Sequence, residues 1–385
     1  MLDQDKINDL DNFEPVARIV VIGVGGAGNN AVNRMIDENI QNVEFYVCNT
    51  DKQALSTSKA QNRIVLGQDV TKGLGAGGDP EVGKKAAEAS KDEIKKIVTG
   101  ADMVFIAAGM GKGTGTGAAP VIAKVAKESG ALTIAIVTRP FNFEGPKRIS
   151  NSVTGLTDLK GVVDSIIIVS NDKLLMASGN APINQAFAES DRILAQSVKT
   201  VADLILVPSL MNLDFADVKS TLQGSGIALI GYGMGKGPNK AEEAAENAIN
   251  SPLLEASISG ARRAICAVTC GQGVTLYEAQ ECVRRINEQA GGAIDIKFGV
   301  SLNPNLEDSL VVSVIASDFT EEFDFTNVPD YSIPREKDKF GIGVDDTKQK
   351  QLAEILKNDD DKKTPEEDIA QDILPDFLRG TFNNK

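Results

Sequence analysis

The sequence predicts an α/β fold, in which a doubly wound, parallel-sheet domain is joined by a long central helix to a smaller α/β domain. Short β-branched runs alternate with longer helix-like segments through the first half of the chain, a pattern typical of parallel sheets. Glycine-rich loops follow several of these runs, at the strand ends where such sheets bind ligands. The length of 385 residues favours two domains, each with a sizeable core.

The expected strands and the central helix can be taken in chain order. Strands are expected at 19–22, 45–49, 103–107, 132–138 and 165–169 in the first domain, and at 227–230, 264–268 and 310–315 in the smaller one. Between the two sets, apolar residues recur at helical spacing from Ile183 to about Val207, which predicts one long helix. They are Phe187, Ile193, Leu194, Val198, Val201, Leu204 and Ile205.

Changes in composition divide the chain into six segments. We expect a flexible N-terminal arm at 1–16, a nucleotide-binding domain at 17–182, the central helix at 183–208, a smaller domain at 209–318, an acidic disordered linker at 319–370 and a C-terminal peptide at 371–385. From 319 onward, 17 acidic residues outnumber 10 basic ones, and most of this stretch has little to bury. The apolar cluster at its end is typical of a docking peptide, although a tail without function would look similar.

The most informative stretch is 109–120, which reads Gly-Met-Gly-Lys-Gly-Thr-Gly-Thr-Gly-Ala-Ala-Pro. It lies between an apolar run and a helix-like segment at 118–129. Glycines let a backbone approach a phosphate, a helix N-terminus adds partial positive charge, and threonine hydroxyls donate hydrogen bonds. The stretch is not a Walker A motif, because Ile106 and Gly113 stand where that motif needs Gly and Ser or Thr. The alternative is a glycine-rich hinge without a ligand.

Two further glycine loops support a nucleotide site. Gly23, Gly25 and Gly28 fit the G-x-G-x-x-G dinucleotide fingerprint and precede a helix-like run at 31–36. Asp51 follows the next strand-like run and could face a ribose, so a nicotinamide-dependent oxidoreductase is an alternative. A third loop at 71–80 precedes a helix-like run from Glu81. Three such loops, each expected between a strand and a helix, suggest a cradle for a long polyphosphate.

Several long segments, found together in this order, resemble the FtsZ family of tubulin-like bacterial cell-division GTPases. The loop GMGKGTGTGAAP resembles the tubulin signature, and the other matching segments are GVGGAGNNAVNRM, NTDKQAL, GLGAGGDPEVGKKAAE, VTRPFNFEGPKR, NLDFADVK and SPLLEASISGAR. The resemblance runs from about Arg18 to Phe319 and resumes at 373–380. It implies a GTP-binding domain, a GTPase-activating domain at 209–318, and head-to-tail protofilaments that form the cell-division ring.

The resemblance also implies the residues that bind GTP or GDP. The phosphates would be held by Gly26, Ala27, Gly28, Asn29, Asn30, Gly113, Thr114 and Gly115, with Ala76 and Gly77 near the γ-phosphate. Glu144 and Arg148 would reach ribose and phosphate, although their spacing also suits a surface ion pair. Asn171 and Asp191 would read the guanine edge, with Phe187 packing on the base. A carboxylate there discriminates against adenine, which lacks the matching pair of donors.

The segment Asn212-Leu213-Asp214-Phe215-Ala216-Asp217 is expected to carry catalysis. Asp214 and Asp217 share one face of a helical first turn, which would equally suit a helix N-terminus without a catalytic role. In the resembling family this loop lies opposite the nucleotide and enters the next subunit's site, so that the active site forms on polymerisation. Asn212 would then help to position the partner's nucleotide and water, and the aspartates would polarise the water. Mg²⁺ is expected with the triphosphate, and no residue is assigned to a metal.

A second alternative is a relative that binds GTP only to control filament assembly, without turnover. The presence of Asn212, Asp214 and Asp217 argues against it. Four residues depart from the family pattern: Lys112 and Ser209, which replace glycines, and Asp79 and Arg192. The tail residues Ile373, Pro375, Phe377 and Leu378 resemble the peptide with which family members bind membrane-tethering and regulatory division proteins.

Composition and charge exclude several other classes of protein. The formal net charge of −14 argues against nucleic acid and anionic membrane as partners. No run of 18 or more apolar residues occurs, and the N-terminus lacks the features of a signal peptide. Four scattered cysteines indicate reduced core thiols, and the absence of histidine excludes histidine-dependent nucleophilic sites. With the resemblance, we expect a cytoplasmic protein that acts at the division site.

Overall fold

The structure is a computed structural model that describes residues 17–178, 183–207 and 209–320. The expected N-terminal arm, the expected linker from 321 onward and the expected docking peptide with Ile373, Pro375, Phe377 and Leu378 lie outside the described residues. Phe319, expected to begin the linker, is instead the last residue of a strand. Every other site residue expected from the sequence lies inside them.

The described chain is built around one ten-stranded sheet in the order β3-β2-β1-β4-β5-β6-β7-β10-β8-β9. The pairs from β3 to β7 are parallel, β10 pairs antiparallel with β7 and β8, and β8 pairs parallel with β9. The mostly parallel α/β architecture is therefore confirmed. The strands are β1 (Ile19–Val24), β2 (Val43–Asn49), β3 (Asn62–Val65), β4 (Met103–Gly109), β5 (Leu132–Arg139), β6 (Ser165–Ser170), β7 (Gly226–Lys236), β8 (Ala261–Cys270), β9 (Asp295–Leu302) and β10 (Ser309–Phe319).

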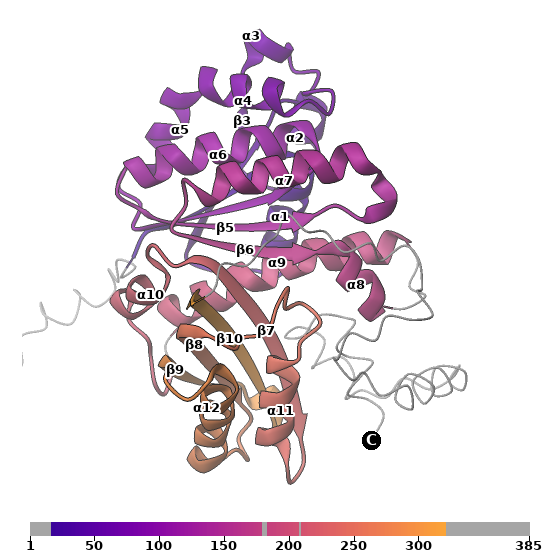
Figure 1. Ribbon diagram of the computed structural model, residues 1–385. Helices are drawn as coiled ribbons and strands as arrows, with labels where there is room; N and C mark the ends of the chain where they lie inside the picture. The colour runs from indigo at the N-terminus through magenta and orange to yellow at the C-terminus, as the bar shows by residue number, and fades with distance from the viewer. Residues whose placement is uncertain (1–16, 179–182, 208, 321–385) are drawn as a thin grey trace, which may run out of the picture.

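Helices cover both faces of the sheet (Figure 1). In the larger half, α4 (Pro80–Ala89), α5 (Lys91–Val98), α6 (Gly113–Glu128) and α7 (Pro146–Lys160) pack on one face, and α1 (Gly25–Asp37) and α9 (Ile183–Leu206) on the other. In the smaller half, α11 (Lys240–Ile249) and α12 (Leu276–Ala290) face α9 and α10 (Phe215–Leu222) across the sheet. The remaining helices are short: α2 (Lys52–Ser56), α3 (Gln68–Thr71), η3 (Asn142–Glu144), α8 (Asn171–Ser178) and η4 (Pro304–Leu306).

The strand β7 and the helix α9 join the two halves. The first three residues of β7 pair with β6, beginning at Ser165↔Gly226, and the strand then pairs with β10 from Leu229 onward. The smaller half therefore extends the sheet of the larger one. The apolar face of α9 is buried in one cluster that contains both Val21 of β1 and Ile265 of β8. Each such buried aliphatic side chain contributes about 1.5–3 kcal/mol of transfer free energy.

Two helices begin earlier than the sequence predicts. The helix α6 begins at Gly113 rather than at 118, and α1 begins at Gly25 rather than at 31. Several of the glycines expected in loops are helical residues without room for a side chain. A Cβ on Gly28 would lie 2.2 Å from the carbonyl oxygen of Ala107, and a Cβ on Gly117 would lie 1.9 Å from that of Pro80. These glycines let the helices pack closely against their neighbours.

Three further differences concern short or polar segments. The strands β3 and β9 were not expected, and both lie at the ends of the strand order. The strand β3 has only four residues and one partner, so its sequence carries a weak signal, whereas β9 alternates apolar and other residues from Ile296 to Leu302 and was overlooked. The third glycine loop, expected after a strand, follows the short helix α3. It nevertheless precedes a helix, because α4 begins at Pro80.

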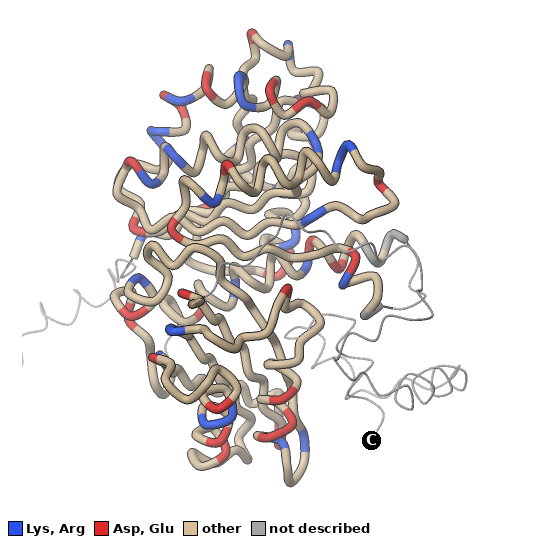
Figure 2. The backbone as a smooth tube through the Cα atoms, in the orientation of Figure 1, with Lys and Arg blue, Asp and Glu red and all other residues tan. Residues whose placement is uncertain are grey.

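Charged residues lie mainly on the helices and connections, as Figure 2 shows, and the strands of the larger half carry few of them. In the smaller half a network joins α12 to α11, since Arg285 pairs with Glu242, Glu246 and Glu281. Among the described helices, none has the length and apolar character needed to cross a bilayer. All four cysteines are buried and free.

Candidate functional site

The N-termini of α1 and α6 meet at the carboxyl ends of the parallel strands. We call this end of the sheet its carboxyl edge and the opposite end its amino edge. The preceding strands are parallel neighbours in the register Val24↔Ala108, so both helices start at the same level. A Cβ on Gly25 would lie 2.9 Å from the backbone nitrogen of Gly115, which places the two backbones in contact. Two helix N-termini in contact concentrate their partial positive charges at one place.

Within the described chain, neither of these helix N-termini is closed by a side chain. Val24 and Lys112 occupy the N-cap positions and make no cap hydrogen bond, and neither first turn contains an acid. The N–H groups of a first turn have no partner inside the helix. The expected phosphate residues Gly26, Ala27 and Gly113 lie in these turns, so their backbone suits an anion.

The loop at 71–80 closes on the same place. The backbone nitrogen of Lys52 donates to the carbonyl oxygen of Gly73 at 3.0 Å, and that of Gly75 donates to Thr50 at 3.1 Å, which ties the loop to the end of β2. The Cβ of Ala76 is 2.8 Å from where a Cβ on Gly113 would lie. All three glycine-rich segments therefore meet at the carboxyl edge of the parallel strands.

Polar side chains behind these segments hold the backbone in place. The hydroxyls of Thr50 and Thr114 lie 2.7 Å apart. When its amide is oriented so that the nitrogen faces acceptors and the oxygen faces a donor, buried Asn29 donates to the carbonyl oxygens of Gly23 and Gly25 and accepts from Asn49. The Asn29 side chain is therefore turned inward, where it holds the backbone of the phosphate segment in place.

The carboxylate of Asp51, which a nicotinamide-binding site would use to bind a ribose, makes structural hydrogen bonds instead. The carboxylate of Asp51 accepts from the backbone nitrogens of Gln53 and Ala54 at 2.8 and 3.3 Å, and thereby caps α2. Such a cap contributes about 1 kcal/mol to helix stability. The geometry thus gives Asp51 a structural role and removes the main support for a ribose contact there.

The residues expected to read guanine lie beyond the carboxyl end of β6. Asn171 is the first residue of α8, and its side-chain oxygen accepts from the Ser190 hydroxyl at 2.8 Å. Asp191 follows Ser190 on α9. Burial raises the pKa of Asp191 to about 7, and the charge of Arg34 opposes that rise. A poorly solvated carboxyl of this kind is stabilised in its charged form by ligand N–H donors.

An aromatic cluster flanks these residues. Phe187 is 42% exposed and packs edge-on against buried Phe141, with ring centroids 5.1 Å apart. Phe141 also stacks on Phe143 at 4.9 Å, and Phe143 is 61% exposed. Phe143 was not among the expected site residues, although it belongs to the matching segment VTRPFNFEGPKR. Two exposed rings on a buried third one suit a flat base.

Glu144 and Arg148 form an ion pair with each other. This pair was the structural alternative to a role in binding ribose and phosphate. Glu144 also accepts from the backbone nitrogen of Phe141 at 3.1 Å. The pair lies beside the start of α6, because a Cβ on Gly111 would lie 2.9 Å from the carbonyl oxygen of Arg148. The reach of these two side chains to ribose and phosphate stays a prediction.

Lys112 places another cation at the start of α6. Its side chain is exposed, and partial burial and then the charge of Arg148 lower its pKa. A cation at a helix N-terminus opposes the helix dipole. Lys112 therefore adds one positive charge to the start of α6, beside the Glu144–Arg148 ion pair.

Asn212, Asp214 and Asp217 lie together at the start of α10. Asp214 is the N-cap, and its Oδ1 accepts from the backbone nitrogen of Asp217 at 2.8 Å. The carboxylate of Asp217 is 3.8 Å from the Lys297 ammonium on β9. The helix-cap interpretation therefore describes Asp214, whereas the half-exposed Asp217 carboxylate caps nothing in the described chain.

These three residues and the glycine-rich segments occupy opposite edges of the sheet. α8 follows the carboxyl end of β6, whereas α10 precedes β7, whose first residue Gly226 pairs with Ser165 at the amino end of β6. Figure 1 shows α10 at the left of the sheet and α8 at the right. The six residues of β6 span about 20 Å. Asp214 and Asp217 therefore do not reach their own subunit's phosphate segments.

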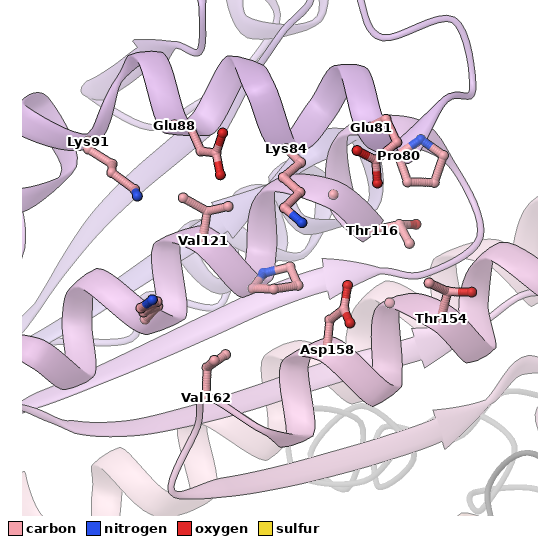
Figure 3. A pocket seen from close by; sticks show the side chains of 14 residues that line it. Pro80, Glu81, Lys84, Glu88, Lys91, Thr116, Val121, Thr154, Asp158 and Val162 are labelled. Atoms are coloured by element: carbon pink, nitrogen blue, oxygen red, sulfur yellow. The ribbon is translucent and has the colours of Figure 1, made fainter.

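A separate groove of about 410 Å³ lies between α4, α6 and α7 (Figure 3). Lys84 and Glu88 of α4 and Asp158 of α7 point into it, and its lining also includes Thr116 and Pro120. It contains none of the residues expected to bind nucleotide or to act in catalysis. We assign it no part in the site.

Comparisons with known proteins agree on one family and fold. Residues 18–179 match the Tubulin/FtsZ family GTPase domain, and residues 226–320 match the FtsZ family C-terminal domain. The structure of an empty FtsZ dimer from M. jannaschii is 40% identical with a TM-score of 0.76, covering 82% of this chain and 92% of that one. CetZ1 from Haloferax volcanii, a GDP-bound monomer, is 23% identical with a TM-score of 0.69, covering 79% of this chain and 95% of that one. A GTPγS-bound protofilament of CetZ2 from the same organism is 23% identical with a TM-score of 0.67. The match covers 78% of this chain and 92% of that one. The CetZ likenesses show the fold alone.

Proposed function

Because this chain belongs to the tubulin/FtsZ family of GTPases, we propose that it is a self-assembling GTPase whose subunits polymerise head to tail into protofilaments of the cell-division ring. GTP is hydrolysed at the junction between neighbouring subunits. One observation carries this proposal: the phosphate segments and the acids at the start of α10 lie at opposite edges of one sheet. Each subunit alone holds two halves of different sites.

Stacking subunits head to tail brings the two halves together. The carboxyl edge of one subunit then faces the amino edge of the next, and Asp214 and Asp217 approach the neighbour's triphosphate. Such a contact is heterologous and does not close on itself, so it generates filaments. The relative from M. jannaschii, at 40% identity, is described as a dimer.

Exposed apolar side chains at both edges support this contact. Leu74 in the third glycine loop is 84% exposed, and Val70 on α3 is 44% exposed. At the other edge, Val207, Leu210 and Met211 precede the acids and are 46%, 67% and 45% exposed. Apolar groups of this size on both ends of a subunit are typical of surfaces that become buried on association.

The residues take complementary roles in this proposal. The first turns of α1 and α6 bind the phosphates through backbone N–H groups, which stabilise charge that develops on the transferred phosphoryl group. Asn171 and Asp191 bind the guanine edge, and Phe187 packs on the base. Asn212, Asp214 and Asp217 of the next subunit orient and polarise the attacking water. Glu144 and Arg148 contact ribose and phosphate.

The proposal includes Mg²⁺ as a companion of the triphosphate. Magnesium in such sites is held mainly by phosphate oxygens and water, with few protein ligands. The Thr50 and Thr114 hydroxyls offer neutral oxygens at the phosphate segments. Within the described residues, no group of three or more Cys, Asp or Glu side chains is arranged to hold a metal ion.

The proposal also covers place and partners. We expect the protein in the cytoplasm at the division site, tethered there by proteins that bind Ile373, Pro375, Phe377 and Leu378. Binding of a labelled peptide of residues 371–385 to membrane-tethering division proteins tests this part. The same peptide with Phe377→Ala is the control and should bind far more weakly.

The experiment that tests the proposed function is a GTPase assay over a range of protein concentrations, with sedimentation in parallel. Specific activity should rise from near zero above a critical concentration, and pelleted protein should appear at that same concentration. Activity per molecule that stays constant on dilution contradicts the shared site. Assembly without any turnover would favour the alternative of a GTP-binding filament protein that does not hydrolyse.

A further inference from the structure

A buried group of charges joins the smaller half of the molecule to the larger one. Glu255 lies between α11 and β8, and its Oε2 is 3.7 Å from the Arg139 guanidinium and 3.9 Å from the Lys173 ammonium. The side chains of Glu255 and Arg139 are 5% and 6% exposed, and that of Lys173 is 21% exposed. We call these three residues the junction cluster. Because they are largely removed from water, their charges interact far more strongly than charges on the surface.

Each cation of the junction cluster belongs to a segment that carries residues of the expected base site. Arg139 is the last residue of β5, and the chain continues from it into the aromatic segment 141–143, with the exposed ring of Phe143. Lys173 is the third residue of α8, which begins at Asn171. Both segments follow the carboxyl ends of two neighbouring parallel strands, β5 and β6. Glu255, from the smaller half, lies beside both cations.

Direct hydrogen bonds also hold the start of α8. The Lys173 ammonium donates to the carbonyl oxygen of Leu254 at 2.6 Å. The neighbouring Asp172 carboxylate accepts from the backbone nitrogen of Asn142 at 3.0 Å. Asn171 itself contacts α9. Three consecutive residues at the start of α8 therefore contact α9, the aromatic segment and the smaller half in turn, so a displacement of Lys173 would also move Asn171.

Charge balance explains why the two cations can lie together. Burial lowers the pKa of Lys173, the charge of Glu255 opposes this effect, and the charge of Arg139 adds to it. Burial raises the pKa of Glu255, and the charges of Lys173 and then Arg139 oppose that rise. Within the described residues, Oε1 of Glu255 accepts no hydrogen bond, so the two cations are its main compensation. Without the Glu255 charge, two poorly solvated cations would repel each other and separate the segments that carry them.

We propose that Glu255 is a positioning residue for base recognition: its charge holds the two cations together and thereby sets the distance between the aromatic segment and the start of α8. The smaller half thus takes part in nucleotide binding through residues that are not themselves expected to contact nucleotide. This inference rests on the proposed function, because it requires Asn171 and the aromatic rings to bind guanine.

Equilibrium binding of GTP to the full-length protein, below its critical concentration, tests the inference. Glu255→Gln keeps the shape and removes the charge, and it should weaken GTP binding by about threefold to thirtyfold, the scale of coupling through packed neighbours. Adding Lys173→Met removes one of the two repelling cations, so the double variant should recover most of that loss. Full affinity in Glu255→Gln, or a further loss in the double variant, would refute the positioning role.

A cycle with Asn171 separates positioning from loss of stability. Glu255→Gln should also lower the free energy of unfolding, because it leaves buried cations without a partner. In an Asn171→Ala background, Glu255→Gln should cost no more than about twofold in GTP affinity, while its effect on unfolding by denaturant remains. Equal losses of affinity in both backgrounds would show that Glu255 does not act through the base site.

A matched control tests whether any weakening of the smaller half reduces binding. Ile286 is fully buried on α12, and Ile286→Ala should destabilise the protein by leaving a cavity. GTP affinity of this variant should stay within about twofold of that of the wild type. A loss as large as that of Glu255→Gln would refute the specific role of the junction cluster. Wild-type protein without any preference for GTP over ATP would instead refute the proposed function.

Discussion

The two edges of the sheet are built on different physical principles. At the carboxyl edge, the groups suited to the ligand are backbone groups in helix first turns, packed so closely that Gly28 and Gly115 admit no side chain. At the amino edge, the groups proposed to act in catalysis are side chains on an exposed loop, held by a bridge to β9 and by the capping of α10.

This difference indicates what each edge can do alone. A rigid backbone cradle is formed before the ligand arrives, so it can bind nucleotide in the isolated subunit. Exposed acids in water gain little from one another and act strongly only once a partner excludes solvent around them. We therefore expect substitutions at the carboxyl edge to change stability and affinity, and substitutions at the amino edge to change turnover.

The largest expected effect is loss of catalysis at the amino edge. Asp217→Ala should reduce turnover by about 10²-fold or more while GTP binding is retained, since the loss of a water-positioning or charge-stabilising group has this scale. Turnover and equilibrium GTP binding are measured on the same preparation. Asp295→Ala is the matched control, because Asp295 lies 3.7 Å from the same Lys297 ammonium and has no assigned role. Equal losses in both variants would point to general charge at this edge.

One added methyl group at the carboxyl edge should lower the free energy of unfolding. Gly28→Ala places a Cβ 2.2 Å from a backbone oxygen, so the free energy of unfolding should fall by about 1–3 kcal/mol or more, the cost of overpacking. Gly26→Ala, two residues away, meets no atom within 4 Å and should leave stability unchanged or slightly raised. Chemical denaturation of both variants measures the difference. Any effect of Gly26→Ala should appear in nucleotide affinity.

Substitution of the residue proposed to recognise the base should have a smaller effect than substitution of Asp217. Asp191→Asn replaces one acceptor oxygen with a donor, and GTP affinity should fall by about 1–3 kcal/mol, the cost of an unmatched buried polar group. Competition between GTP and ATP on the monomeric protein measures the change in preference. An unaltered preference for GTP would place guanine recognition elsewhere on the molecule.

The raised pKa of Asp191 also predicts a pH dependence of binding. In the proposed site the charged carboxylate is the form that accepts from guanine, and burial raises its pKa to about 7. As pH falls below 7, the free protein takes up a proton that binding must expel, so affinity should fall by up to about tenfold per pH unit. Above pH 7 affinity should level off. The dependence should be absent from Asp191→Asn, in which titration of the phosphates alone remains.

The two edges also differ in how well the sequence predicts them. The glycine-rich segment at 109–120 can be recognised from the sequence, because close backbone approach requires glycine at fixed positions. These positions all lie within one short segment. The position of the helix start was missed, since Gly113 and Gly25 look like loop residues until the neighbouring Asp79 and Gly115 backbones are seen against them. Helix propensity gives no sign of that contact.

The amino edge depends on contacts between distant segments. The loop at 209–214 is placed by pairing with β9, a strand distant in sequence, so its geometry could not be predicted locally. The orientation of Asn212 depends on the backbone nitrogen of Ser209, which no sequence pattern reveals. The catalytic and nucleotide-binding assignments remain predictions, because they concern a neighbouring subunit and a bound ligand.

The smallest expected effect concerns Lys112, which is exposed at the carboxyl edge. Two outcomes are physically distinct. An ammonium directed at the phosphates would strengthen nucleotide binding, so Lys112→Gly would weaken it, more so at low salt. A side chain directed at the incoming subunit would instead act on assembly, because a charge at an interface alters association. Nucleotide affinity of the monomer and the critical concentration, measured together, separate the two.

We expect Lys112→Gly to act on assembly. The side chain is exposed, the charge of Arg148 beside it disfavours a second cation at the phosphates, and the backbone of Gly113 already approaches closely. The edge of the incoming subunit carries Asp214 and Asp217, so loss of the cation should raise the critical concentration by about twofold to fivefold, the scale of a partly exposed charge pair. High salt should reduce the difference. Lys112→Gln, which keeps the length without the charge, should behave in the same way. A large loss of monomer affinity with unchanged assembly would show that Lys112 belongs to the phosphate site.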